Sequence, residues 1–215
     1  MAAVVDLVRD VKQVMQQCPA LSIQRAYVRA ARMFCLESRW LRRVITATLV
    51  PNTQYYSLGS DTLLEIIALG PVQFTTPPVP GRGQNVISIN SADPGTFDPN
   101  QSPGAPCWYA YIPEAQIGFN PTPNLAYPVS ITLIVQPRDG VAQIPDELVV
   151  KWRYAFEEGC KWFLYEIPGE PWSEPGKAQL CRQNYRGWVN EARAEVNRGY
   201  QQGPVRARPR APWIV

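Results

Sequence analysis

Val44-Ile45-Thr46-Ala47-Thr48-Leu49-Val50 is the stretch at which the chain changes its hydrophobic period. Before it, apolar residues recur at spacings of three and four, which line one face of a helix. Within it, β-branched residues dominate and side chains alternate in polarity, as is typical of a strand, and Pro51-Asn52 then predicts a turn. The stretch therefore marks the point where a helical first part gives way to β structure.

Residues 1–43 are predicted to form two helices. Cys18-Pro19 ends the first, because proline disfavours a helical residue before it, and Ser22 is expected to cap the second. The apolar face of the first helix comprises Val4, Leu7, Val8, Val11, Val14 and Met15. The second helix buries a face that includes Tyr27, and its other side carries a basic stripe made of Arg25, Arg29, Arg32 and Arg39.

Residues 44–145 have the pattern of an inserted β subdomain. Gly and Pro separate short alternating segments, and 14 of the 22 prolines of the chain lie within residues 61–145, which is typical of antiparallel structure. Strands are predicted at 44–50, 54–58, 63–69, 86–90, 107–112, 116–120 and 129–136. The connections 72–84 and 91–106 are long and stiffened by proline, and long loops in a compact domain are often functional.

Residues 146–198 return to helical spacing. Ile144-Pro145-Asp146 is a helix start signal, and Ser173 can cap a further helix with Pro175 in its first turn. These two helices hold more aromatic residues than the seam between them needs, so a few are expected at a subunit interface. The aromatic set is Trp152, Phe156, Trp162, Phe163, Tyr165, Trp172, Tyr185 and Trp188. The predicted fold class is α+β: a helical bundle built from N- and C-terminal helices, an inserted antiparallel β subdomain, and an extended C-terminal arm over residues 199–215.

Composition excludes several kinds of chemistry. The chain has no histidine, which removes Ser-His-Asp and Cys-His nucleophiles and HExxH zinc sites. The carboxylate pairs Asp146/Glu147 and Glu157/Glu158 are adjacent residues on one predicted helix, so the two members of a pair point apart and do not form a catalytic dyad. No metal or cofactor is expected: the loop of Asp93, Asp98 and Asn100 lacks calcium-loop spacing. We therefore predict that the protein is not an enzyme.

The five cysteines are scattered, which indicates small buried residues in a reducing compartment. No stretch of 18 uninterrupted apolar residues is present, so no membrane-spanning segment is expected. A net charge of only +3 argues against an electrostatic nucleic-acid clamp, and the basic stripe is interpreted as a solvated face or one that pairs with acids of a neighbouring subunit.

The arm is the most informative segment. Arg206, Arg208 and Arg210 alternate with prolines and small residues, which favours an extended conformation. The apolar Trp213, Ile214 and Val215 follow and have nothing of their own to bury against. An arm that docks on another chain explains both features better than a solvated tail does.

Four features, in this order, resemble the head-to-tail adaptor (connector, or gatekeeper) proteins of tailed bacteriophages, including the tail tubular protein A type. They are a helix pair ending in Glu37-Ser38-Arg39-Trp40, the strand-turn-strand from Ile45 to Leu58, the helix opened by Ile144-Pro145-Asp146-Glu147-Leu148, and Pro171-Trp172 before a long Arg/Glu-rich helix. The pattern covers most of residues 1–198. The proline-rich loops and the arm depart from it and leave the morphological subgroup open.

The resemblance implies a structural virion protein at the head–tail interface, assembled in the host bacterial cytoplasm. It implies a ring of 12 that binds the portal protein on one side and tail tube or nozzle proteins on the other, while genomic DNA passes through the channel without sequence-specific binding. Residues 206–215 would then contact the portal or a neighbouring subunit, and the basic stripe would face a neighbour or the channel. The alternatives are a tail-completion or nozzle protein and a glycan- or peptide-binding β module around Trp108-Tyr109.

Overall fold

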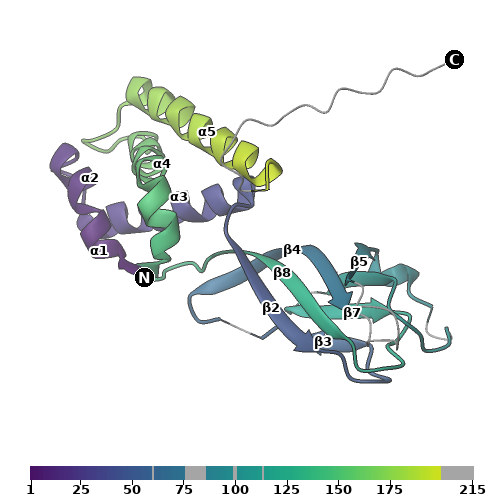
Figure 1. Ribbon diagram of the computed structural model, residues 1–215. Helices are drawn as coiled ribbons and strands as arrows, with labels where there is room; N and C mark the ends of the chain where they lie inside the picture. The colour runs from purple at the N-terminus through teal and green to yellow at the C-terminus, as the bar shows by residue number, and fades with distance from the viewer. Residues whose placement is uncertain (60, 76–85, 99–100, 113, 200–215) are drawn as a thin grey trace, which may run out of the picture.

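The computed structural model describes residues 1–59, 61–75, 86–98, 101–112 and 114–199. Helices come from both ends of the chain and gather on one side, while the strands from the middle of the chain form the other side (Figure 1). The expected mixed α and β fold, with β structure inserted between helices, is confirmed.

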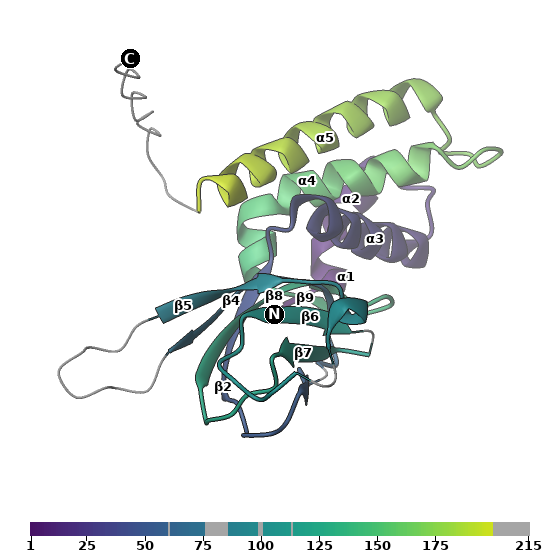
Figure 2. The same cartoon turned by 90° about the vertical axis from the view of Figure 1, so that its right-hand side faces the viewer.

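Five helices are present in the described residues. They are α1 (Val4–Leu7), α2 (Arg9–Val14), α3 (Ala20–Ser38), α4 (Asp146–Tyr165) and α5 (Pro175–Asn197). Helix α3, from the N-terminal part, packs against α4 and α5 from the C-terminal part, and α4 and α5 lie side by side above the sheet (Figure 2). The ring of Phe34 on α3 lies 5.3 Å from that of Phe156 and 5.2 Å from that of Trp152.

Three local predictions for the helices were wrong. The single helix expected over residues 4–15 is divided at Val8 into α1 and α2, and Val14 points outward with 61% of its surface exposed. Ser22 does not cap α3, because the helix already begins at Ala20, directly after Pro19, whose ring fixes φ near its observed −59°. Ser173 does not cap α5 either: its Oγ donates to the Tyr165 carbonyl, and Glu174 precedes the helix.

Seven strands form one sheet in the order β2-β8-β4-β5-β6-β7-β3. The strands are β2 (Arg42–Thr48), β3 (Tyr55–Ser57), β4 (Leu64–Thr75), β5 (Val86–Ser91), β6 (Trp108–Ile112), β7 (Gln116–Asn120) and β8 (Pro128–Pro137), and a short 3₁₀ helix, η1 (Pro94–Thr96), follows β5. The predicted strands are confirmed within a few residues at most ends. Strand β4, however, continues to Thr75, so residues 72–75 of the loop expected over 72–84 belong to the strand, and residues 76–84 lie outside the described residues.

One pairing departs from the expected antiparallel sheet. Strands β5 and β6 run parallel, with Asn90 opposite Trp108 and Ser91 opposite Tyr109. Two neighbouring parallel strands need a connection that carries the chain back to the end of the sheet where the first strand began. The segment between β5 and β6 provides this connection. The Gly- and Pro-rich spacing predicted a long loop there but not the direction of the next strand.

The sheet curls so that its two edges approach each other. Strands β2 and β3 stand at opposite edges of the sheet, yet only residues 49–54 connect them. Six residues span at most about 20 Å, so a flat seven-stranded sheet is excluded. The Tyr56 hydroxyl fixes this connection: it accepts from the Val50 N–H, and its single proton lies within hydrogen-bond reach of both the Val50 and the Thr53 carbonyl oxygens.

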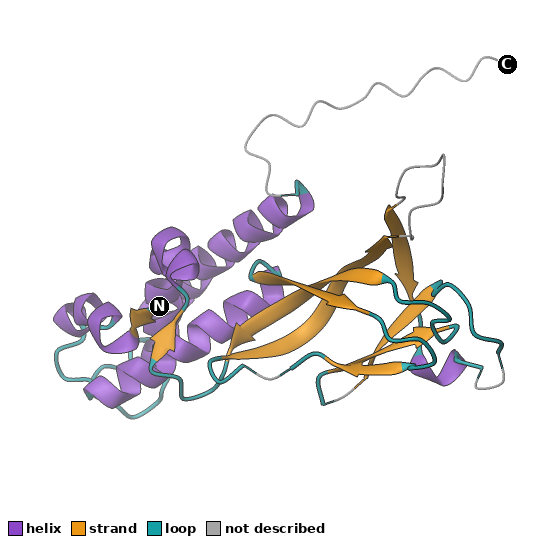
Figure 3. Cartoon of the chain, turned by 60° about the horizontal axis from the view of Figure 1, so that its bottom comes forward, coloured by secondary structure: helices purple, strands orange, loops and turns teal. Residues whose placement is uncertain are grey.

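A second, two-stranded sheet lies at the junction of the helices with the sheet. It pairs β1 (Ala2–Ala3) with β9 (Gln143–Ile144), two strands that the sequence patterns did not predict. Strand β9 directly precedes α4, so the pair ties the start of the described chain to the return into the helices (Figure 3). No helix in the described part of the chain is long and apolar enough to cross a membrane.

Candidate functional site

A groove of about 940 Å³ runs along α3 where that helix faces α1 and the connection between β8 and β9. Its charged lining combines three of the four predicted arginines, Arg25, Arg29 and Arg32, with Asp139. Its apolar lining includes Val5 and Leu21, which are 63% and 57% exposed. The groove is therefore amphipathic, with cationic groups beside unburied aliphatic surface.

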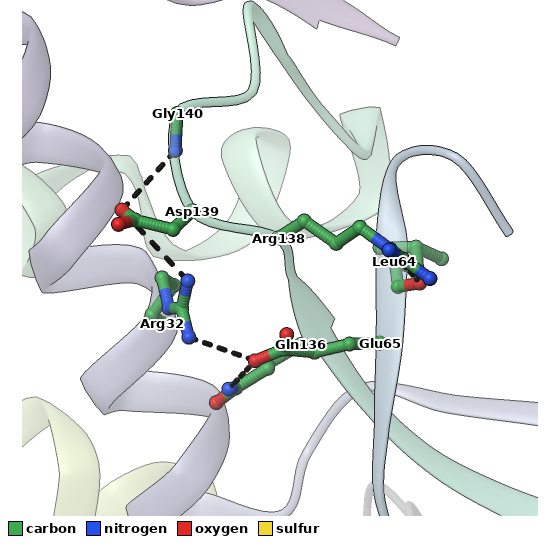
Figure 4. A network of polar contacts seen from close by, with 7 residues as sticks. All are labelled: Arg32, Leu64, Glu65, Gln136, Arg138, Asp139 and Gly140. Atoms are coloured by element: carbon green, nitrogen blue, oxygen red, sulfur yellow. Dashed lines mark hydrogen bonds and ion pairs between the residues drawn. The ribbon is translucent and has the colours of Figure 1, made fainter. Parts of the chain in front are cut away.

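Arg32 connects α3 to the sheet. Its guanidinium donates to Glu65 Oε1 on β4 at 2.8 Å and lies 3.8 Å from Asp139 Oδ1 (Figure 4). The Gln136 side-chain amide of β8 donates to the same Glu65 oxygen. Asp139 is positioned in turn by the Gly140 N–H, which donates to its carboxylate at 3.1 Å. The acids that face Arg32 thus belong to its own chain, and its side chain is three-quarters buried.

The other three arginines of the predicted stripe have different surroundings. Arg29 lies over the ring of Phe163, with its guanidinium carbon 4.4 Å from the ring centroid. Arg25 is exposed on the same face of α3. Arg39 is not in the groove: it ends α3 in the left-handed conformation, with φ 55°, and is exposed. The sequence pattern thus places three arginines correctly on one face, and the fourth belongs to the helix terminus.

The arm residues predicted to bind a partner lie outside the described residues. They are Arg206, Arg208, Arg210, Trp213, Ile214 and Val215. Helix α5 ends at Asn197, and Gly199 follows with a positive φ of 67°.

A second groove, of about 570 Å³, lies on the outer side of α4 and α5 and was missed at the sequence level. Tyr154 of α4 and Trp188 of α5 line it, together with Gly187. Tyr154 is 68% exposed, and Val150, one turn before it, is 86% exposed. A signal was available: Val149 and Val150 are adjacent on a helix, so both cannot face the core, and Tyr154 lies four residues after Val150.

The aromatic residues predicted on α4 and α5 are mostly core, as expected. Six of the eight are buried, while Trp172 and Trp188 are half-buried. The exposed aromatic residue of these helices is instead Tyr154, which the prediction did not include. Its position leaves aromatic surface open on the side of α4 that faces away from α3.

The carboxylates of α4 are held in ion pairs. Glu157 accepts from Arg153 Nε at 2.9 Å. Burial acts to raise the pKa of Glu158, but hydrogen bonds from Asn184 and Lys161 outweigh burial, so the pKa lies below its ordinary value. A general acid at neutral pH needs the opposite shift. These residues are therefore arranged as structural anions.

The thiols of Cys35, Cys160 and Cys181 are equally unsuited to nucleophilic chemistry. Burial raises the pKa of Cys35 and Cys160, and raises that of Cys181 to about 11, so these thiols stay protonated at neutral pH. Four cysteines are buried, as predicted, and Cys107 is exposed, which was not. No group of three or more potential metal ligands occurs in the described ranges.

Trp108 and Tyr109 do not form a joint platform for a sugar ring. They are neighbours on β6, so their side chains point to opposite faces of the sheet. Trp108 is 44% exposed, whereas Tyr109 is buried and donates its hydroxyl to the Gly70 carbonyl at 2.9 Å. The glycan-binding alternative loses the aromatic pair on which it depended.

The fold and its grooves define a mixed α and β protein whose open surfaces are suited to contacts with other macromolecules. The chain belongs to the SU10 adaptor protein family, whose sequence model matches residues 2–210. It is therefore a structural adaptor of the bacteriophage virion, a class that contacts portal and tail components. A comparison with curated proteins gives no match.

Proposed function

We propose that this chain forms the ring that joins the portal to the tail, with twelve copies around a channel through which DNA passes during ejection. The family match over residues 2–210 carries the proposal, because it covers the helices, the sheet and most of the arm together. In this proposal the protein has a structural role without catalysis, is similar to the tail tubular protein A type, and is assembled in the host bacterial cytoplasm.

The α3 groove is the surface that meets a neighbouring copy in this ring. A contact with DNA phosphates needs cations alone, whereas this groove combines Arg25 and Arg29 with exposed Val5 and Leu21. An amphipathic groove of this kind fits a protein surface that has carboxylates next to aliphatic groups. Arg32 is already paired within its own chain, so Arg25 and Arg29 are the groups available to a neighbour.

Residues 199–215 bind the portal or an adjacent subunit in this proposal. The test mixes purified full-length chain with the portal protein and measures complex formation by sedimentation. Deletion of residues 200–215 is expected to abolish portal binding and to leave the circular dichroism spectrum unchanged. Unchanged binding would refute the role of the arm. Binding to tail tube proteins with none to the portal would favour a tail-completion or nozzle protein instead.

The neighbour contact is tested with two arginine variants. Arg25→Glu combined with Arg29→Glu is expected to prevent ring formation on the portal while single subunits stay folded. Arg39→Glu is the control, because Arg39 is an exposed arginine at the C-terminal end of the same helix and does not line the groove. Complete rings with the double variant would exclude this groove from the subunit interface.

A further inference from the structure

The outer groove between α4 and α5 has a composition suited to a basic, proline-rich peptide. Its two ring-bearing lining residues, Tyr154 and Trp188, come from different helices, α4 and α5. Its charged lining residues are both carboxylates, Glu158 and Glu191. Grooves lined by aromatic rings are the usual binding sites for proline-rich segments, and nearby carboxylates select those that carry arginine.

The two carboxylates differ in whether they can accept a hydrogen bond from a bound peptide. Glu158 already accepts from Lys161 and Asn184. Glu191 is exposed and has no ion pair in the described residues. Glu191 is therefore the anion of the groove that can pair with an incoming cation.

Gly187 keeps the groove open at a cost to its helix. A glycine inside a helix is less favourable than alanine by about 1 kcal/mol. A Cβ atom added at Gly187 would meet nothing within 4 Å, so packing within the chain gives no reason for the glycine. A side chain at this position would instead occupy part of the groove, because Gly187 is itself a lining residue, one helical turn from the lining residues Gln183 and Glu191.

The chain itself carries a segment with the matching chemistry. Residues 204–212 contain Pro204, Pro209 and Pro212 and, between them, Arg206, Arg208 and Arg210. Proline favours an extended backbone that loses little entropy when it is bound. We propose that the groove formed by α4 and α5 binds residues 204–212 of the same chain.

The distances favour the same copy over a second one. Trp188 precedes Gly199 by eleven residues, which in a helix is about 16 Å. Arg208 follows Gly199 by nine residues, which reach up to about 30 Å. The positive φ of Gly199 turns the chain away from the helix axis at the start of this path. A segment tethered this closely has an effective concentration in the millimolar range, far above that of another copy in dilute solution.

This contact goes beyond the adaptor function proposed above and does not require it, because the segment and the groove belong to one chain. It holds residues 204–212 against their own helices until a partner displaces them. The α4–α5 groove then determines when the arm is free to bind another protein.

The experiment uses the full-length chain with a photoreactive benzophenone amino acid in place of Ala207. The sample is an equal mixture of ¹⁵N-labelled and unlabelled protein at low micromolar concentration, and cross-links are mapped by mass spectrometry after irradiation. We expect cross-links from position 207 to residues 150–158 or 183–191, with both ends carrying the same isotope. Cross-links that join different isotopes, or that map elsewhere, would overturn the proposal.

Two glycine variants complete the test. Gly187→Gln fills the groove and is expected to lower the cross-link yield by about tenfold, which corresponds to roughly 1.4 kcal/mol of binding free energy. Gly176→Gln is the control: this residue is also in α5, an added Cβ also meets nothing within 4 Å, and it does not line the groove. Equal yields for the two variants would exclude the groove. Portal binding, measured separately by sedimentation, decides the adaptor proposal and does not affect this result.

Discussion

Gly159 and Gly187 lie on neighbouring helices, and each is near aromatic side chains, but their surroundings are opposite. Gly159 of α4 is buried in the seam with α3 and α5, where an added Cβ would lie 2.8 Å from Ala30 Cβ and 2.8 Å from Cδ2 of Tyr185. Gly187 of α5 has nothing within 4 Å of an added Cβ. The inner glycine allows three helices to approach closely, whereas the outer one leaves a groove unfilled.

The comparison separates residues that stabilise the fold from residues that shape a surface. In the seam, the Tyr185 ring fills the space that Gly159 leaves, and its hydroxyl donates to the Ala30 carbonyl at 3.1 Å. In the outer groove, Tyr154 stays exposed and nothing in the described chain covers it. Stability measurements should therefore respond to the seam, and binding measurements to the groove.

Removal of the seam tyrosine is expected to have the largest effect. Tyr185→Ala should lower the free energy of unfolding by about 3–5 kcal/mol, because it leaves a cavity and removes the hydrogen bond from the Tyr185 hydroxyl to the Ala30 carbonyl. Tyr154→Ala is the matched control and should change it by less than about 0.5 kcal/mol. Urea denaturation of the two variants measures both values. Similar losses for the two tyrosines would contradict the division into seam and surface.

The glycines themselves provide the next test. Gly159→Ala should destabilise the protein by about 1–3 kcal/mol, because the methyl group overlaps Ala30 and the Tyr185 ring. Gly187→Ala should stabilise it by up to about 1 kcal/mol, because alanine is the better helix former and meets no neighbour. Thermal unfolding followed at 222 nm gives the sign of each change. Two changes of the same sign would show that the glycines have equivalent surroundings.

The polar junction between helices and sheet should matter less than the buried seam. Arg32 and Glu65 are partly exposed, so a double-mutant cycle of Arg32→Ala and Glu65→Ala should give a coupling energy below about 1 kcal/mol. The interaction should also weaken in high salt. A coupling energy as large as the loss caused by Tyr185→Ala would instead make this ion pair the main link between the two halves.

The smallest expected effect is a pH dependence at the groove. Because the pKa of Glu158 is lowered in the folded protein, its carboxylate stabilises the fold above its unfolded pKa. That contribution is lost as the pH falls through the folded value, below about pH 4.3. Wild type should thus exceed Glu158→Gln in stability at pH 7, and this difference in stability should shrink as the pH is lowered below about 4.3. A difference in stability that stays constant over this pH range would mean that the ion pair of Glu158 with Lys161 does not contribute to the free energy of unfolding.

Local patterns predicted most of the secondary structure. The change of period at Val44 and the Gly and Pro spacing placed all seven strands of the main sheet, because alternation and turn residues are properties of short segments. Helix ends were less accurate: Ser22 and Ser173 are suitable caps by residue type, but Pro19 and Glu174 occupy the positions before the helices. Residues of a type that can cap a helix are common in sequences, and tertiary packing decides at which of them the helix begins.

The candidate surfaces were predicted only in part. Spacing by three and four placed Arg25, Arg29 and Arg32 on one face of α3, as the groove requires. The pairing of Arg32 with Glu65 was not predictable, because these residues, 33 positions apart, come close only when the sheet packs against α3. The outer groove was missed because the aromatic residues of α4 were interpreted mainly as core, although Tyr154 lies on the exposed side of that helix.

The residue pattern is enough to show that helices come from both ends of the chain and strands from its middle, and that no imidazole chemistry is available. Hydrophobic period, proline position and composition are local quantities, so they can be determined without a fold. The strand order, the parallel β5–β6 pair and the difference between Gly159 and Gly187 become visible only in the folded chain. The physical reason is that these depend on which residues distant in sequence come within contact distance, and a glycine has the same local character in a packed seam as in an open groove.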